Sequence, residues 1–168
     1  MAAIKVNPTR MELKRLKGQL ATARRGHKLL KDKCDEVMRR FLDAVREAKE
    51  LREKLSVTLG DVDGRFSIAA AQTDPRMMTA ALMLPAGGGE LSVGEENIMS
   101  VIVPRYDFSY DKGKSASPYG FAFTTSALDL ATDELTDVLP ELVHLAQLEK
   151  TSLLLCDEIE RTRRRVNA

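Results

Sequence analysis

The sequence predicts a mainly α-helical protein: a long antiparallel, left-handed two-helix coiled coil, with a small β-hairpin-containing insertion between the helices. Two apolar stripes carry this prediction. One repeats in a 3-4 spacing over seven heptads of the N-terminal third, and the other runs through the C-terminal quarter. The stretch between them contains Pro-Ala-Gly-Gly-Gly and many β-branched and aromatic residues, which favour turns and strands. A period close to 3.5 residues indicates a left-handed supercoil.

The first helix is predicted over residues 8–73. Asn7 and Thr9 are both suitable N-caps, and Pro8 suits the first turn of a helix. The stretch from Thr9 to Glu12 has the pattern of a capping box, in which each end satisfies a free amide of the other. The sequence therefore marks the start of this helix clearly.

The same helix is expected to end before Asp74-Pro75, because proline disfavours a helical conformation at the residue before it. Its heptad grid weakens after Thr58, where two glycines follow. The seam residues predicted on this helix are Leu13, Leu16, Leu20, Leu30, Val37, Phe41, Leu51 and Leu55.

The insertion is predicted over residues 74–124. A short helix is expected first, ending at the run of glycines. Strands are expected near Glu90–Val93 and Ile98–Tyr110, and we expect Pro104 to interrupt the second because proline cannot donate to a ladder. Residues 121–125 (FAFTT) are a candidate for a final strand. A small β-hairpin is the simplest interpretation.

The last helix is predicted over residues 125–168, with Pro140 either kinking or restarting it. A step of three residues from Leu142 to Leu145 and again to Leu148 is a slip in the heptad, which should overwind the coil locally. The seam residues predicted on this helix are Leu142, Leu145, Ile159 and Val166.

The two predicted helices differ in length. At 1.5 Å per residue the first would be about 96 Å long and the second about 63 Å. If they pair from the insertion outward, Ala168 lies opposite roughly residue 31. The stripe that would then lack a partner in this chain is Leu13, Leu16, Leu20 and Ala23. Because an unpaired helix is marginal in water, we expect another protein or a further length of C-terminal helix to cover this stripe.

Catalytic and nucleotide-binding motifs are missing from the sequence: it has no P-loop, dinucleotide fingerprint, HExxH or nucleophile elbow. His27 lies on the heptad grid, where a polar residue can fix the register, and His144 is expected at or near the surface. Cys34 and Cys156 lie on apolar stripes and are expected to pack in the core. We therefore expect no catalytic residue, no cofactor and no metal site. No apolar run is long enough to span a bilayer.

Charge is distributed unevenly, although the net charge is only +1. Between Lys5 and Lys31 there are nine Lys or Arg and a single acid, Glu12. Such a run indicates an acidic partner, either nucleic acid or protein. The helix lacks the aromatic side chains on which bases stack, and no nucleic-acid recognition module is visible. Residues 160–166 (ERTRRRV) add a second basic patch, which an antiparallel coil places at the same end.

Three stretches together resemble the D subunit of the V/A-type ATPases. They are NPTRMELKRLKGQLATARRGHKLLKDKCDEVMRRF (7–41), NIMSVIVP (97–104) and LPELVHLAQLEKTSLLLCDEIERTRRRVNA (139–168). The resemblance implies a central-stalk rotor shaft, a long antiparallel coiled coil with a short β-hairpin region that holds no nucleotide itself. Members of that family continue past RRVNA, so the C-terminal helix is expected to be truncated here.

The resemblance also implies partners: the F subunit, the hexamer of A and B subunits, and the funnel-shaped subunit above the membrane ring. It places the chain at the cytoplasmic face of the membrane, peripherally, with no nucleic acid and no direct membrane insertion. The residues assigned to the hexamer contact are Arg10, Lys14, Lys17, Arg24, Arg25, Lys28, Arg163, Arg164 and Arg165. Those assigned to the contact with the F subunit are Arg46, Glu50, Lys54, Leu139 and Leu148.

Two other functions remain open. A helix, β-hairpin, helix arrangement is also the plan of a prefoldin-like holdase chaperone, which would assemble into a hexamer through its hairpins. A nucleic-acid-binding coiled coil would rest on the basic run alone and would bind with a steep dependence on salt. The residues by themselves support an antiparallel coiled coil with a β insertion that needs partners.

Overall fold

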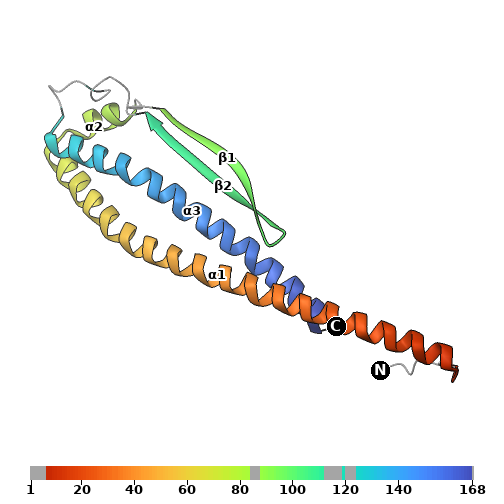
Figure 1. Cartoon of the computed structure of the whole chain (residues 1–168). Helices are drawn as coiled ribbons and strands as arrows, with labels where there is room; N and C mark the ends of the chain where they lie inside the picture. The colour runs from red at the N-terminus through yellow and green to blue at the C-terminus, as the bar shows by residue number, and fades with distance from the viewer. Residues whose placement is uncertain (1–6, 84–87, 112–118, 120–123, 168) are drawn as a thin grey trace.

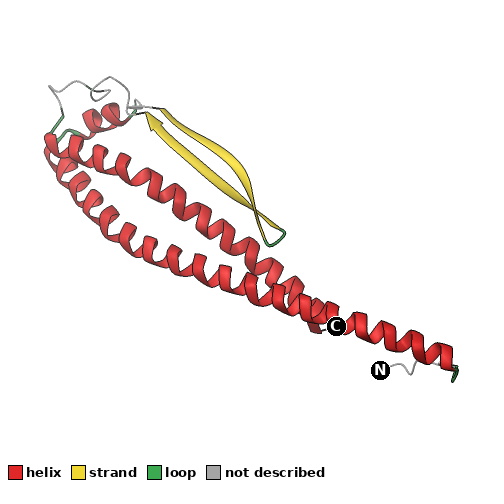
Figure 2. Ribbon diagram, in the orientation of Figure 1, coloured by secondary structure: helices red, strands yellow, loops and turns green. Residues whose placement is uncertain are grey.

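The computed structural model describes residues 7–83, 88–111, 119 and 124–167. It shows two long helices lying side by side, with a β-hairpin running along one of them (Figure 1). Helices make up most of the chain (Figure 2). The elements in chain order are α1 (Arg10–Gln72), α2 (Pro75–Leu82), β1 (Gly88–Ile98), β2 (Val101–Asp111) and α3 (Ser126–Asn167).

The start of α1 follows the predicted cap. Thr9 has an extended backbone, and its hydroxyl accepts a hydrogen bond of 3.3 Å from the amide of Glu12. The other half of the predicted capping box is not formed, because the amide of Thr9 donates to the carbonyl of Asn7 at 2.8 Å and the carboxylate of Glu12 forms an ion pair with Arg15. At the other end, Thr73 leaves the helical conformation, and Asp74 caps α2 by accepting a hydrogen bond of 2.8 Å from the amide of Arg76. The predicted break before the proline is therefore confirmed.

The long helices α1 and α3 are antiparallel. Arg65, near the end of α1, pairs with Glu134, near the start of α3, whereas Lys33 pairs with Glu158 near the other end of α3. Only an antiparallel pair brings both couples together. This confirms the predicted arrangement of the two helices.

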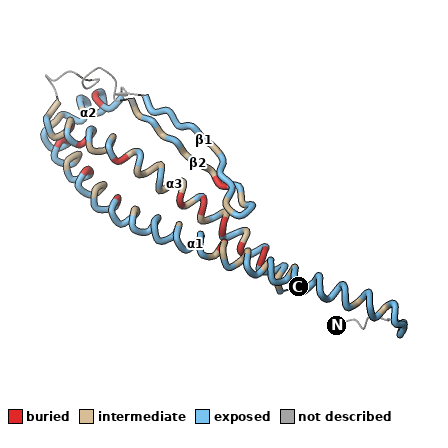
Figure 3. Tube along the Cα trace, in the orientation of Figure 1, coloured by how far each residue is buried: buried red, intermediate tan, exposed pale blue. Residues whose placement is uncertain are grey.

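The apolar seam of α1 continues further than its sequence indicates. Val37 and Leu55 are buried as expected, and so are Val62 and Ala69, which extend the heptad beyond Thr58 (Figure 3). The expectation that the grid weakens there is therefore wrong. The two glycines of this region lie off the seam, with no atom near the position of an added Cβ. Burial of the seam outweighs their low helix propensity.

The helix α3 is buried on more than one side, because α1 packs on one side of it and β2 packs on another. Its buried positions include the polar residues Thr151 and Thr162 and the apolar residues Val138 and Leu155. Pro140 lies inside the helix, which runs unbroken from Ser126 to Asn167. Burial on two sides explains why its apolar pattern is less regular than that of α1.

The strands β1 and β2 form one two-stranded antiparallel sheet, in which Gly88 pairs with Asp111 and Ile98 with Val101. The first strand is thus longer than predicted, and Ile98 belongs to it rather than to the second. The two residues between the strands, Met99 and Ser100, have φ values of 52° and 71°. Two positive φ values are typical of a type I′ turn, which sequence usually signals with glycine or asparagine.

Pro104 does not interrupt β2, which corrects the prediction. It lies opposite Glu95 in the ladder. Two residues later the amide of Tyr106 donates a hydrogen bond of 2.8 Å to the side chain of Gln147 on α3, so it points away from β1. Alternate residues of a strand share this orientation, so position 104 needs no amide directed at β1. Proline is tolerated at such a position.

The hairpin lies along α3, and its turn points away from α2, towards the end of the coil where α3 stops (Figure 1). Near this turn Ile98 and Val101 pack against the core cluster of Val37, Leu155 and Ile159. A second cluster, of Ala69, Ala81 and Leu128, joins α1, α2 and α3 at the opposite end. Most of the candidate strand 121–125 falls outside the described residues, and Thr124 and Thr125 precede α3 without strand structure.

Candidate interaction surfaces

The first third of α1 extends beyond the end of α3 (Figure 1). Val166, close to the end of α3, lines a pocket together with His27 and Lys31, which confirms the predicted level at which the two helices part. N-terminal to this point, Leu13 is 54% exposed and Leu20 is exposed to a similar extent. Within the described part of the chain, these leucines therefore lack the cover that the rest of the seam receives.

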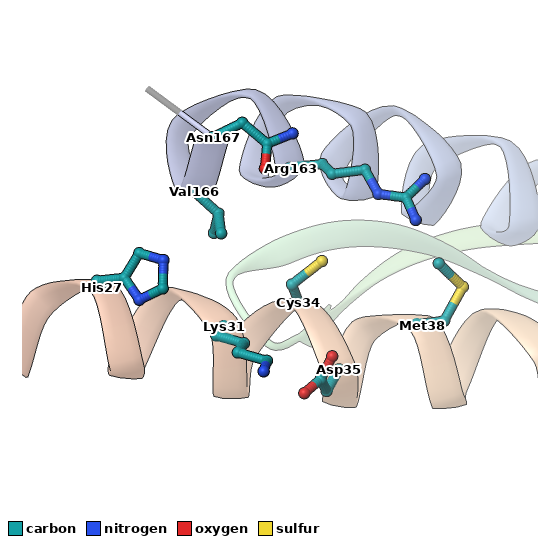
Figure 4. Close-up of a pocket in the computed structure, with 8 residues that line it drawn as sticks. All are labelled: His27, Lys31, Cys34, Asp35, Met38, Arg163, Val166 and Asn167. Atoms are coloured by element: carbon teal, nitrogen blue, oxygen red, sulfur yellow. The ribbon is translucent and has the colours of Figure 1, made fainter.

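The pocket where α3 ends has a volume of about 470 Å³. Figure 4 shows Cys34 and Met38 pointing from α1 towards α3, and Val166 pointing back towards α1. His27, predicted on the seam, is exposed at this rim. Cys34 packs against the core, as expected, whereas Cys156 is exposed, so the expectation that it is a core residue is wrong.

The predicted seam residues fall into three groups. Val37, Leu55 and Ile159 are buried. Leu13 and Leu20 are exposed beyond the end of α3. The remaining members are half-buried: Leu16, Leu30, Phe41, Leu51, Leu142, Leu145 and Val166.

A basic surface covers the end of the coil away from the insertion. All nine residues assigned to it from the sequence are exposed, and they come from the start of α1 and the last turns of α3. Of these, Arg164 forms an ion pair with Glu160 on the same helix. Helical pairs of this kind are exposed and weak, so they leave most of the positive charge available to a partner.

A half-buried ion pair lies at the base of this basic end. The ammonium of Lys33 is 2.8 Å from the carboxylate of Glu158, and the hydroxyl of Thr162 donates to the same carboxylate oxygen at 3.3 Å. The hydrogen bond from Lys33 is the main reason why the pKa of Glu158 lies below its ordinary value. The group joins the two helices just where they begin to part.

An apolar groove between α1 and α3 lies further along the coil, with a volume of about 580 Å³. Phe41 and Val45 line it from α1, and Leu153 and Cys156 line it from α3. Leu153 is 65% exposed, an unusual position for a leucine in the middle of a coil. No pattern in the sequence indicated this groove, because Leu153 lies off the predicted heptad grid.

The residues assigned to the contact with the F subunit do not all lie on the surface. Arg46, Glu50 and Lys54 are exposed, and Lys54 forms an ion pair of 2.5 Å with Glu141 on α3. Leu139 is half-buried. The structure buries Leu148 to 8% exposure, so the expectation that it belongs to an exposed contact is wrong. It follows the heptad slip at a point where α3 is covered on two sides.

The described residues contain no cluster of three or more histidine, cysteine, aspartate or glutamate side chains able to hold a metal ion. In the same part of the chain, no helix combines the length and the hydropathy that a membrane crossing requires. The features that stand out are surfaces: a basic end, an apolar groove and a hairpin lying on α3. These are features with which a protein binds partners.

Comparison with known proteins identifies the family of this chain. The family model for the D subunit of ATP synthase matches residues 12–168. The V-type ATP synthase D subunit of Acetivibrio thermocellus is 54% identical over 170 residues, covering 100% of this chain and 77% of the relative. That of Clostridioides difficile strain 630 is 48% identical over 169 residues, covering 100% and 76%. The chain therefore belongs to the family of ATP synthase D subunits, the non-catalytic stalk subunits of the V-type rotary complex.

Proposed function

We propose that this chain is the central-stalk rotor shaft of a V/A-type ATPase. In this role it couples ATP synthesis or hydrolysis in the hexamer of A and B subunits to ion transport, through rotation. The observation that carries the proposal is the antiparallel pair of α1 and α3, in a chain that belongs to the D-subunit family. A shaft must resist twisting, and two helices joined by a continuous buried seam are stiffer than one.

The basic end of the coil is the proposed contact with the hexamer. Its exposed arginines and lysines attract acidic loops, and each such contact is weak in water. Weak individual contacts suit a surface whose contacts are broken and remade at every step of rotation. Within this proposal the exposed leucines of the free part of α1 face the inside of the hexamer.

The proposed contact with the F subunit is the apolar groove, together with the exposed charges of Arg46, Glu50 and Lys54. Leu153 offers an apolar side chain that a partner can bury, and such side chains in the centre of an interface contribute much of its affinity. Leu139 stays part of the proposed contact, and Leu148 does not.

The opposite end of the molecule is the proposed seat on the funnel-shaped subunit. Met77, Leu82 and Met83 are exposed there, on and beside the short helix α2. Exposed apolar side chains at one end of a rod favour a contact with another protein. As part of the ATPase complex, the proposed position of the chain is peripheral, at the cytoplasmic face of the membrane.

Reconstitution tests the proposal. The purified chain is mixed with the F subunit and, separately, with the A/B hexamer of the same complex, and the products are followed by size-exclusion chromatography at two salt concentrations. A one-to-one complex with the F subunit, together with hexamer capture that weakens in salt, would support the shaft. Binding to neither, or assembly of the chain alone into a hexamer, would overturn it. No observation favours the prefoldin-like alternative.

A further inference from the structure

Among the residues that the structure describes, the outer edge of the hairpin has no neighbouring strand. The inner strand, β2, lies against α3, where Gln147 accepts the hydrogen bond from the amide of Tyr106. The outer strand, β1, pairs with β2 alone over its 11 residues. All of these residues are exposed apart from Gly94 and Ile98, which are half-buried. Within the described residues, the second edge of β1 is therefore open to solvent.

The register fixes which backbone groups this edge presents. Tyr106 directs its amide away from β1, and Val93 is its partner in the ladder. In an antiparallel pair, both residues of such a couple turn their amide and carbonyl outwards, and the pattern repeats at every second residue. Leu91, Val93 and Glu95 therefore direct unpaired backbone donors and acceptors away from the hairpin. A long unpaired edge of this kind is a template for a further strand.

The side chains of β1 define the chemistry of the strand that it fits. Leu91 and Val93 are at least half exposed and give an apolar face. Glu90, Glu95 and Glu96 give the strand three negative charges and no positive one. In the described part of the chain, these three carboxylates form no ion pair. A second copy of β1 would place glutamates against glutamates, which is unfavourable.

We propose that the free edge of β1 binds an extended segment of another protein, in which lysine or arginine alternates with apolar residues. The segment adds a third strand to the sheet. Its backbone pairs with Leu91, Val93 and Glu95. Its basic side chains meet Glu90 and Glu96, which share one face of β1, and its apolar side chains meet Leu91 and Val93 on the other face. This mode of recognition takes its affinity from backbone hydrogen bonds and its specificity from alternate side chains. The proposal stands on the hairpin and does not depend on the shaft function.

The test uses the full chain and a seven-residue peptide in which lysine alternates with valine and threonine; a matched peptide has glutamate for lysine. Binding is followed by amide hydrogen exchange and by the change in amide chemical shifts. The expected result is saturable binding of the basic peptide only, with slower exchange at Leu91, Val93 and Glu95 and weaker binding at high salt. Absence of protection at these amides at millimolar peptide would overturn the proposal.

Two variants separate an edge contact from charge attraction alone. Val93→Pro removes one outward amide but no hydrogen bond to β2, because the amide of residue 93 points away from β2. Proline is tolerated at such a position, as Pro104 shows on β2. The variant should weaken peptide binding about tenfold. Val93→Thr keeps the amide and should bind normally. Equal binding by both variants would mean that the peptide merely neutralises charge, and the proposal would fail.

A third variant tests the competing explanation for the glutamates, which is that they only prevent self-association of the edge. Changing Glu90, Glu95 and Glu96 to glutamine should lower affinity for the basic peptide about tenfold. If the unmodified chain does not bind the peptide and this variant self-associates, the three glutamates serve only to protect the edge, and the proposal fails.

Discussion

The ammonium of Lys33 on α1 lies 2.8 Å from the carboxylate of Glu158 on α3, with both side chains less than one third exposed. Other ion pairs between the two helices, such as that of Arg65 with Glu134, are more exposed. A partly desolvated pair is stronger than a surface pair, and it is sensitive to the loss of either partner. Its position fixes the register of the helices where the coil opens.

Replacement of Glu158 by glutamine should lower the free energy of unfolding by about 1 kcal/mol at neutral pH. Because folding lowers the pKa of Glu158, the pair stabilises the folded chain above the ordinary value of 4.5 and this contribution is lost as the pH falls through the lowered value. Urea unfolding, followed by circular dichroism at pH 7 and at acidic pH, measures the difference. Glu160→Gln, which removes an exposed pair with Arg164, should change little.

Several elements could be predicted from the sequence because their signals are local. The cap at Thr9, the break before Pro75 and the heptads around Val37 and Leu55 depend on neighbours within one or two turns. The antiparallel pairing then followed from the single short insertion between two long helices. These predictions are confirmed by the bounds of α1 and by the ion pairs along the coil.

Features that depend on distant contacts could not be predicted in this way. The hairpin packs on α3, so this helix has a second neighbour besides α1, which a heptad pattern of two helices does not predict. Pro104 is tolerated because of the register of the strands, which the sequence does not state. The groove at Leu153 is lined by side chains of both helices, and no local motif marks it.

Shortening a leucine side chain of the seam should lower the free energy of unfolding strongly where α3 covers the seam, and little where it does not. Leu155 is 1% exposed and packs with Val37 and Ile159, so Leu155→Ala should lower the free energy of unfolding by about 2–5 kcal/mol. Leu13→Ala makes the same chemical change on the exposed stripe and should cost little in the isolated chain. Urea unfolding of both variants checks this, and equal losses would contradict the assignment of a free N-terminal stretch.

The turn of the hairpin should respond to a single glycine. Ser100 has a φ of 71°, which costs a residue with a side chain about 1–2 kcal/mol. Ser100→Gly should therefore slow hydrogen exchange in the strands beside the turn. Asn97→Ala should speed it, because the side chain of Asn97 accepts a hydrogen bond of 2.8 Å from the amide of Ser100. Unchanged or faster exchange in Ser100→Gly would contradict the strain at Ser100, and unchanged or slower exchange in Asn97→Ala would contradict the role of the Asn97 hydrogen bond.

The basic end should control hexamer capture through charge. Changing Arg24, Arg25 and Lys28 to glutamine should weaken capture by the A/B hexamer and flatten its dependence on salt, because the contact is electrostatic and exposed. Chromatography at two salt concentrations measures both effects. Capture unaffected at either salt concentration would contradict the assignment.

Cations elsewhere on α1 provide the control for that experiment. Arg40, Arg46 and Lys49 are also exposed, but each forms an ion pair within α1 and lies away from the basic end. Their change to glutamine should leave hexamer capture unchanged. An equal loss with either triple variant would mean that overall charge, rather than the basic end, determines capture.

The groove gives the sharpest test of the contact with the F subunit. Leu153→Asp places a charge on its lining and should weaken the one-to-one complex about tenfold or more, since a central apolar side chain is lost and a carboxylate must be desolvated. Val57→Asp is the matched control, because Val57 is 68% exposed, against 65% for Leu153, and does not line the groove. Isothermal titration with the F subunit measures both affinities, and circular dichroism confirms that helicity is kept. If the two aspartates weakened binding equally, the groove would not be the site, because general surface charge would then explain the loss.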